Sequence, residues 1–222
     1  MLLFKPVVIS ALLPGAIAAV AGGLHQRAVT DIPSDSFNSL DEYWNYYYPW
    51  GQTHNGGAKM TKEQVSVENG VLKLTATPTS NEADPIHYYS GAIHAKKTFT
   101  VAAGGGYDIN AEFIAPVAKG TWPAFWLNAA SGWPPEIDIA EWKGSGKISF
   151  NTFNTSSEVE ALDVDYPNPG SWHSVKAEIR DVNGYEVSTK FYLDGKLVTT
   201  QIANDYVGKG LRLYVSCSFL SR

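Results

Sequence analysis

Short stretches in which apolar and polar side chains alternate recur along most of the chain. In residues 106–114 every second side chain is apolar, and the residues between are mostly polar or acidic. This period of two is typical of a half-buried strand. After the N-terminal apolar run, no apolar pattern of period 3.6 is sustained over three turns, so we expect no long amphipathic helix. The pattern predicts an all-β chain.

Turn-forming residues separate these stretches. Asp194-Gly195 lies between Phe191-Tyr192-Leu193 and Lys196-Leu197-Val198, which predicts a two-residue hairpin. Gly, Pro, Asn and Asp bound most of the other runs. Many short strands of this kind predict an antiparallel sandwich or barrel. The expected strands are 71–77, 89–97, 106–114, 123–128, 136–142, 148–154, 172–180, 188–193, 196–201 and 211–218.

The N-terminal end has a different pattern. Lys5 precedes an apolar run from Val7 to Val20, and Ala19-Val20-Ala21 has the small-x-small pattern of a signal peptidase site. Pro14-Gly15 interrupts the run, which is too short to span a bilayer comfortably. We expect a secreted protein, with an uncleaved anchor as the alternative. The expected division is a signal peptide at 1–21, a short leader at 22–33 and one folded domain at 34–222.

Composition narrows the possible partners. The 222 residues are 44% hydrophobic with a net charge of −5, which fits a folded domain and argues against nucleic acid or an anionic membrane as the main partner. Cys217 is the one cysteine, so an internal disulfide and a Cys-based zinc site are excluded. The five histidines show no HxH or HExxH spacing. We therefore expect no cofactor, although the sequence leaves a structural calcium ion open.

Three carboxylates lie within six residues of an otherwise apolar segment, Glu136-Ile137-Asp138-Ile139-Ala140-Glu141. Glu136 and Asp138 share one strand face, but Glu141 has the opposite parity and would point into the core. An unpaired carboxylate is costly to bury there. One additional residue, a β-bulge at Ala140, would return Glu141 to the face of Glu136.

With such a bulge the two glutamate carboxyls would approach to about 5–6 Å, close to the roughly 5–5.5 Å of a retaining glycosidase. One carboxylate then attacks and the other protonates the leaving oxygen. Neighbouring negative charges raise each other's pKa, so at least one proton is retained. A solvated acidic face and a calcium site are the competing interpretations, although ligands along a single strand wrap an ion poorly. We expect catalysis.

The segment 136–141 resembles the ExDxxE signature of glycoside hydrolase family 16, in the bulged form of its laminarinase branch. Residues 121–127 (TWPAFWL) are similar to the family's WPAFW segment, and Tyr89-Ser90-Gly91 is similar to its YxSG stretch. The resemblance runs from about residue 34 to the C-terminus. It implies a concanavalin A-like jelly-roll sandwich of two curved antiparallel sheets with a concave sugar cleft. It also implies that Glu136 is the nucleophile, Glu141 the acid/base and Asp138 the residue that tunes Glu136.

Aromatic side chains near the acidic strand are candidates for sugar binding, because sugars present flat C–H faces to aromatic rings. Trp122 and Trp126 share one strand face, whereas Phe125 and Leu127 share the other, and we place only the tryptophans in the cleft. By parity Trp142 belongs to the core. His54-Asn55-Gly56-Gly57 resembles a loop that borders the cleft. The candidate substrate-binding residues are Trp122, Trp126, Trp133, Tyr89, His94 and Asn151.

The resemblance implies a secreted retaining endo-glycosidase that hydrolyses a β-1,3-linked polysaccharide, as glucanases do. The sequence departs from many relatives at two positions: it has Ala92 in place of Arg and Asn151 in place of His. These departures make a β-1,3-galactan the main rival substrate. The sequence also leaves open a transglycosylase and an inactive lectin-like module. We expect a monomer whose partner is the polysaccharide, with no membrane contact once the signal peptide is cleaved.

Two further expectations concern glycosylation and the C-terminus. Asn154-Thr155-Ser156 is a glycosylation sequon, which agrees with secretion. Family domains continue with more sheet after the strand that corresponds to 211–218. Here only Phe219-Leu220-Ser221-Arg222 follow it. We therefore expect either a truncated C-terminus or a domain weakened by an unpaired sheet edge.

Overall fold

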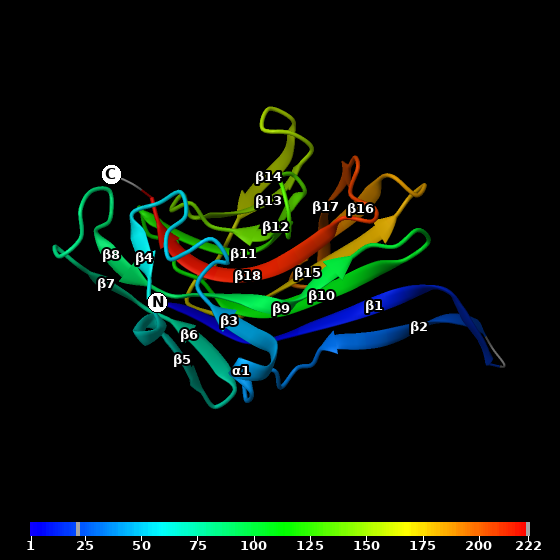
Figure 1. Ribbon diagram of the computed structural model, residues 1–222, viewed down its shortest axis with the longest axis horizontal. Coiled ribbons are helices and arrows are strands. Elements are labelled where there is room, and N and C mark those ends of the chain that lie inside the picture. Colours follow the sequence, from blue (N-terminus) through cyan, green and yellow to red (C-terminus); the bar gives the residue numbers. More distant parts are fainter. Residues whose placement is uncertain (21–22, 221–222) are drawn as a thin grey trace.

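Two antiparallel sheets lie face to face and enclose the main core (Figure 1). The computed structural model describes residues 1–20 and 23–220, with the side chains of residues 6, 13–20 and 23–28 outside the description. We call the two sheets the outer sheet and the cleft sheet. Within the described residues, helical structure is limited to α1 (Leu40–Tyr43) and the 3-10 turn η1 (Lys62–Gln64), and neither is long enough to cross a bilayer.

The outer sheet has the order β17-β16-β15-β10-β1-β6-β5, with β2 paired to β1. The cleft sheet has the order β14-β13-β12-β11-β18-β9-β3. A small third sheet has the order β4-β8-β7. The bounds are β1 Leu2–Val20, β2 Gly23–Ile32, β3 Trp44–Tyr46, β4 Ala58–Met60, β5 Val65–Glu68, β6 Val71–Leu74, β7 Ala76–Pro78, β8 Tyr88–Ser90, β9 Ala92–Thr100, β10 Gly106–Ile114, β11 Thr121–Ala129, β12 Glu136–Glu141, β13 Lys147–Phe153, β14 Val159–Asp165, β15 His173–Asp181, β16 Val187–Leu193, β17 Lys196–Ala203 and β18 Gly210–Phe219.

Each strand expected from the alternating pattern is present. The strand expected at 106–114 has the same bounds as β10, and the predicted hairpin joins β16 to β17. Asp194 and Gly195 have φ values of 50° and 75°, the left-handed backbone that such a hairpin requires. The expected strands 71–77 and 89–97 are each divided between two sheets.

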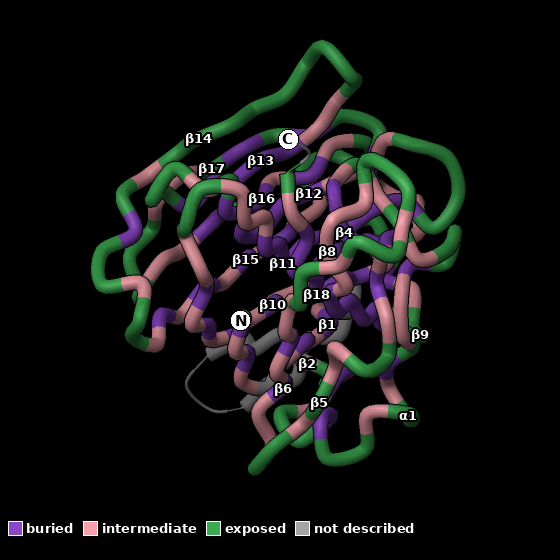
Figure 2. Tube along the Cα trace, turned by 90° about the vertical axis from the view of Figure 1, so that its left-hand side faces the viewer, coloured by how far each residue is buried: buried purple, intermediate pink, exposed green. Residues whose placement is uncertain are grey.

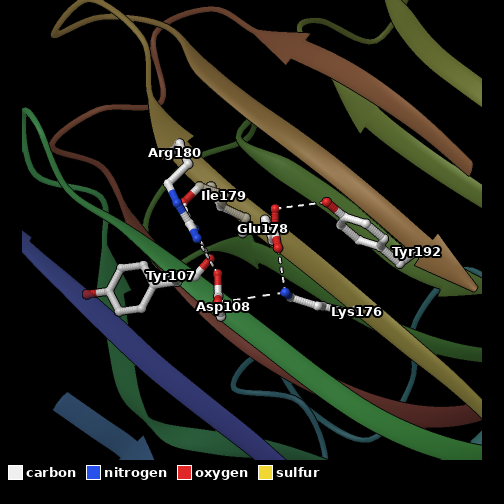
Figure 3. A network of polar contacts seen from close by, with 7 residues as sticks. All are labelled: Tyr107, Asp108, Lys176, Glu178, Ile179, Arg180 and Tyr192. Atoms are coloured by element: carbon white, nitrogen blue, oxygen red, sulfur yellow. Dashed lines mark hydrogen bonds and ion pairs between the residues drawn. The ribbon is translucent and has the colours of Figure 1, made fainter. Parts of the chain in front are cut away.

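Polar residues on the outward face of the outer sheet form a network of their own (Figure 3). Asp108 on β10 accepts from Arg180 on β15, and Lys176 pairs with Glu178 along β15. Tyr192 on β16 donates to Glu178 over 3.0 Å. These residues alternate with buried ones along each strand, which is why the inward face remains apolar. Figure 2 shows the buried positions gathered in the middle of the molecule and the exposed ones at its rim.

The N-terminal segment differs from its expected role. Residues predicted to be a removable signal peptide form β1, which pairs with β10 on one side and β6 on the other (Figure 1). Leu2, Phe4, Val7 and Ile9 are fully buried in the core. The predicted leader contributes β2, paired to β1. The expected cleavage point after residue 21 lies outside the described residues.

The expected division at 1–21 and 22–33 stays a prediction, because the pairing of β1 does not test whether the segment is removed. An apolar run of this kind suits a buried strand as well as a signal peptide. β18 pairs with β11 on one side and β9 on the other. The expected truncated or weakened C-terminus concerns sheet that would follow β18, so it stays a prediction.

Candidate active site

The cleft sheet carries the acidic strand β12 near its middle, and β12 contains a bulge. Across β11, Asp138 and Ala140 oppose adjacent residues, so Ile139 has no partner there. Across β13 the register shifts between Asp138 and Glu141. Ile139 and Ala140 are both fully buried in the core. The bulge agrees with the parity argument, and Ile139 rather than Ala140 is the additional residue opposite β11.

The bulge brings the three carboxylates to one face. Glu136, Asp138 and Glu141 line a single pocket. The same three residues also line a wider groove. Each carboxylate has its own set of donors, and the differences between these sets separate the three groups chemically.

Glu141 has donors on both of its oxygens. Trp122 donates its Nε1–H to Glu141 Oε1 over 2.6 Å. Asn151 donates its Nδ2–H to Oε2 over 2.9 Å, and Lys143 Nζ lies 3.0 Å from the same oxygen. The Glu141 side chain is only 10% exposed, so these donors replace the water that an ionised carboxylate loses on burial.

Glu136 has a different environment. Burial raises its pKa to about 7, a hydrogen bond from Trp133 opposes that rise, and the charge of Glu141 adds to it. The Trp133 Nε1–H donates to Glu136 Oε2 over 2.6 Å. Tyr206 fixes the backbone at this point, because its hydroxyl accepts from the Glu136 N–H over 2.9 Å.

Asp138 lies between the two glutamates along β12 and is buried. Burial raises its pKa well above the usual value, and the charges of Glu141 and Glu136 raise it further. Asn151 donates to Asp138 Oδ2 over 2.9 Å as well as to Glu141, so one amide links two carboxylates. The cluster therefore retains a proton near neutral pH, and Asp138 is the residue whose surroundings favour it.

Aromatic rings form the rest of the pocket. Trp126 stacks on Tyr214 with ring centroids 4.7 Å apart and lies 5.3 Å from the His54 ring. Trp122 and Trp126 both line the pocket, while Phe125 and Leu127 belong to the core, as parity predicts. Because Trp126 is only 4% exposed, it forms part of the floor rather than an open platform.

Two further predicted residues lie on the wall of the wider groove. Trp133 is 44% exposed there, and its ring centroid is 5.7 Å from that of Phe153. Asn151 lines the same groove, but its amide contacts carboxylates rather than open space. Trp142 is fully buried in the core, as expected.

Tyr89 and His94 require correction. Tyr89 lies on β8 of the small third sheet and donates to Glu82 over 3.1 Å, away from the residues that line the pocket. His94 is on the cleft sheet, but Tyr47 O lies 2.7 Å from its Nδ1 and the side chain is buried. Tyr89 was chosen from its likeness to the YxSG stretch, and such a likeness does not record that the chain passes between sheets at Gly91. His94 lies on β9, with its ring centroid 5.9 Å from that of Tyr214.

The structure also brings to the cleft residues outside the list of candidate substrate-binding residues. Trp50 and Tyr48 stack with centroids 5.1 Å apart over the Trp126 end of the cleft, where His54 joins them. Lys143 lines the wide groove two residues after Glu141. The signal for Lys143 was its closeness to the acidic motif, but a charge after a strand usually faces solvent.

Comparisons with known proteins agree with this geometry. The family model for Glycosyl hydrolases family 16 matches residues 51–216. A galactan endo-beta-1,3-galactanase of Flammulina velutipes is 49% identical over 199 residues, which cover 85% of this chain and 80% of that protein. An endo-1,3-1,4-beta-glycanase of Rhizobium meliloti (strain 1021) is 40% identical over 148 residues, which cover 54% of this chain and 31% of that protein.

Solved structures show the same fold. A prokaryotic beta-1,3-1,4-glucanase (lichenase) derived from a mouse hindgut metagenome superposes with a TM-score of 0.61 at 14% identity, covering 80% of each chain. At that identity the likeness concerns the fold alone, a jelly-roll sandwich of antiparallel sheets.

Proposed function

The chain belongs to glycosyl hydrolase family 16 and is a glycoside hydrolase. From that premise we propose that it cleaves internal bonds of a β-1,3-linked galactan, with retention of anomeric configuration. One observation carries the reaction: the bulge places Glu141 in the same aromatic-lined pocket as Glu136. The substrate rests on the galactanase that is 49% identical over most of both chains. β-1,3-Glucan, which the sequence placed first, becomes the second candidate substrate.

In the proposed reaction Glu136 attacks the anomeric carbon while Glu141 gives its proton to the departing glycosidic oxygen. The Glu136–glycosyl ester is then attacked by water, whose proton returns to Glu141. Asp138 holds a proton between them, which lowers the negative charge that Glu136 faces before attack. Trp133 fixes one Glu136 oxygen, so the other is directed into the pocket.

We also propose that the enzyme acts outside the cell as a monomer. A polysaccharide does not enter cells intact, and the N-terminal pattern and the sequon at Asn154 support export. β1, which contains this N-terminal pattern, lies in the outer sheet, and removal of a signal peptide would take it out of that sheet.

The experiment is a reducing-end assay on β-1,3-galactan and laminarin, with the product anomer observed by NMR within minutes of cleavage. We expect galactan cleavage with β product first. Glu136→Gln and Glu141→Gln should each lower the rate by about 10³-fold or more while circular dichroism stays unchanged. An initial α product, or near-normal activity in either purified variant, would refute the assignment.

A further inference from the structure

Lys143 makes a contact that the proposed reaction does not use. It lies just after β12, its ammonium is 3.0 Å from Glu141 Oε2, and its side chain is 43% exposed in the wide groove. Glu141 itself is 10% exposed. A general acid must carry a proton before it reacts, and a neighbouring cation disfavours that protonated form, so the contact with Lys143 needs an explanation.

The other groups around Glu141 are negatively charged or neutral. Glu136 and Asp138 on β12 place negative charge beside it, and Asp163 on β14 lies close enough to Lys143 to raise its pKa. His54 lines the same pocket, and burial lowers its pKa, so it carries no charge at neutral pH. Trp122 and Asn151 donate to Glu141 but are neutral.

Lys143 is therefore the cation that faces Glu141 among the described residues that line these pockets. Burial alone would lower the pKa of Lys143, but the charge and hydrogen bond of Glu141 and the charge of Asp163 raise it, so the ammonium persists.

We propose that Lys143 is a positioning residue that stabilises the ionised form of Glu141 and thereby sets how readily this carboxyl gives up its proton and takes one back. The inference rests on the proposed acid/base role of Glu141. In the first step the Glu141 proton moves to the glycosidic oxygen as the C–O bond breaks, and the new carboxylate faces the ammonium. In the second step water attacks the anomeric carbon, the ester bond to Glu136 breaks, and the water proton returns to Glu141.

The ammonium favours the ionised state in both steps, so it limits activity at high pH, where Glu141 has already lost its proton. The 3.0 Å contact favours the ionised carboxylate, and the partial exposure of Lys143 weakens this effect. In Lys143→Met the basic limb of the kcat/KM profile should therefore move to higher pH, by more than about 0.2 unit.

The experiment compares Lys143→Met with Lys143→Arg, which keeps the charge, and with Lys196→Met, which removes an exposed lysine in the β16–β17 hairpin. We expect the limb to move in Lys143→Met alone. A limb that stays within about 0.2 unit of wild type, or one that moves equally in Lys143→Arg, would overturn the proposal.

A second measurement does not depend on turnover. In a Glu136→Gln background, carboxyl-¹³C glutamate can be titrated by NMR, with the Glu141 signal assigned by its loss in Glu141→Gln. Lys143→Met should raise the observed Glu141 pKa, and an unchanged value would overturn the proposal. If the proposed function fails, wild-type protein will not cleave the polysaccharides at all, which is a different result from an unmoved titration.

Discussion

The position of β1 can be tested with two neighbouring substitutions. Phe4 points into the core, where its ring packs edge-on against Phe113 at 4.1 Å and Phe125 at 5.2 Å. Leu3 is the next residue on the same strand, but it is only half-buried on the outer side. Phe4→Ala and Leu3→Ala therefore change the hydrophobicity of one segment similarly but affect the core differently.

The two substitutions are expected to lower the free energy of unfolding by very different amounts. Truncation of a fully buried Phe to Ala costs about 3–5 kcal/mol, whereas a change outside the core costs about 1 kcal/mol or less. For a domain of this size, 1 kcal/mol corresponds to roughly 2–4 °C in Tm. Phe4→Ala should therefore lower the Tm by about 6–20 °C, and Leu3→Ala by only a few degrees.

Removal of the whole segment should have a larger effect. Leu2, Phe4, Val7 and Ile9 are each fully buried, and burial of such a side chain contributes about 1.5–3 kcal/mol. Together they contribute about 6–12 kcal/mol, which is comparable to the entire net stability of about 5–15 kcal/mol of a typical domain. A chain that begins at residue 22 should then fail to fold cooperatively.

The assay combines intact mass, which gives the N-terminus of the purified protein, with thermal unfolding followed by circular dichroism. A folded, active protein that has lost residues 1–21, with the same Tm for wild type and Phe4→Ala, would refute the strand assignment. That result would support the interpretation of the segment as a cleaved signal peptide.

Three further results follow from the site. Trp133→Phe keeps an aromatic ring but removes the hydrogen bond that lowers the pKa of Glu136. Because Glu136 must be ionised to attack, the acidic limb of the kcat/KM profile, expected near pH 7, should move to higher pH. An unmoved limb would contradict that role of Trp133. Asn151→Ala removes the amide that links the other two carboxylates and should lower kcat about 10²-fold with unchanged circular dichroism; a change confined to KM would contradict this. Tyr89→Phe should leave kcat and KM within about twofold, since its hydroxyl donates to Glu82 and does not line the pocket, and a large rise in KM would place it in the cleft after all.

Much of the site followed from parity along one strand. An acidic residue at the wrong parity in a buried strand is too costly to leave unpaired, so Glu141 required a bulge, and the structure contains one. The same parity placed Trp122 and Trp126 in the cleft and Trp142 in the core. The candidate Tyr89 came from a motif likeness, which does not record that the chain leaves one sheet for another at Gly91.

The sequence by itself determined the all-β class, most strand positions, the hairpin at Asp194-Gly195 and the face on which the three carboxylates lie, since all of these depend on the local backbone period and on turn chemistry. Only the tertiary structure decided that residues 2–12 lie between β10 and β6 and that Lys143 reaches Glu141. The physical reason is that an apolar run or a lone lysine is compatible with several partners. Which partner is met depends on strands that are far away along the chain and adjacent only after folding.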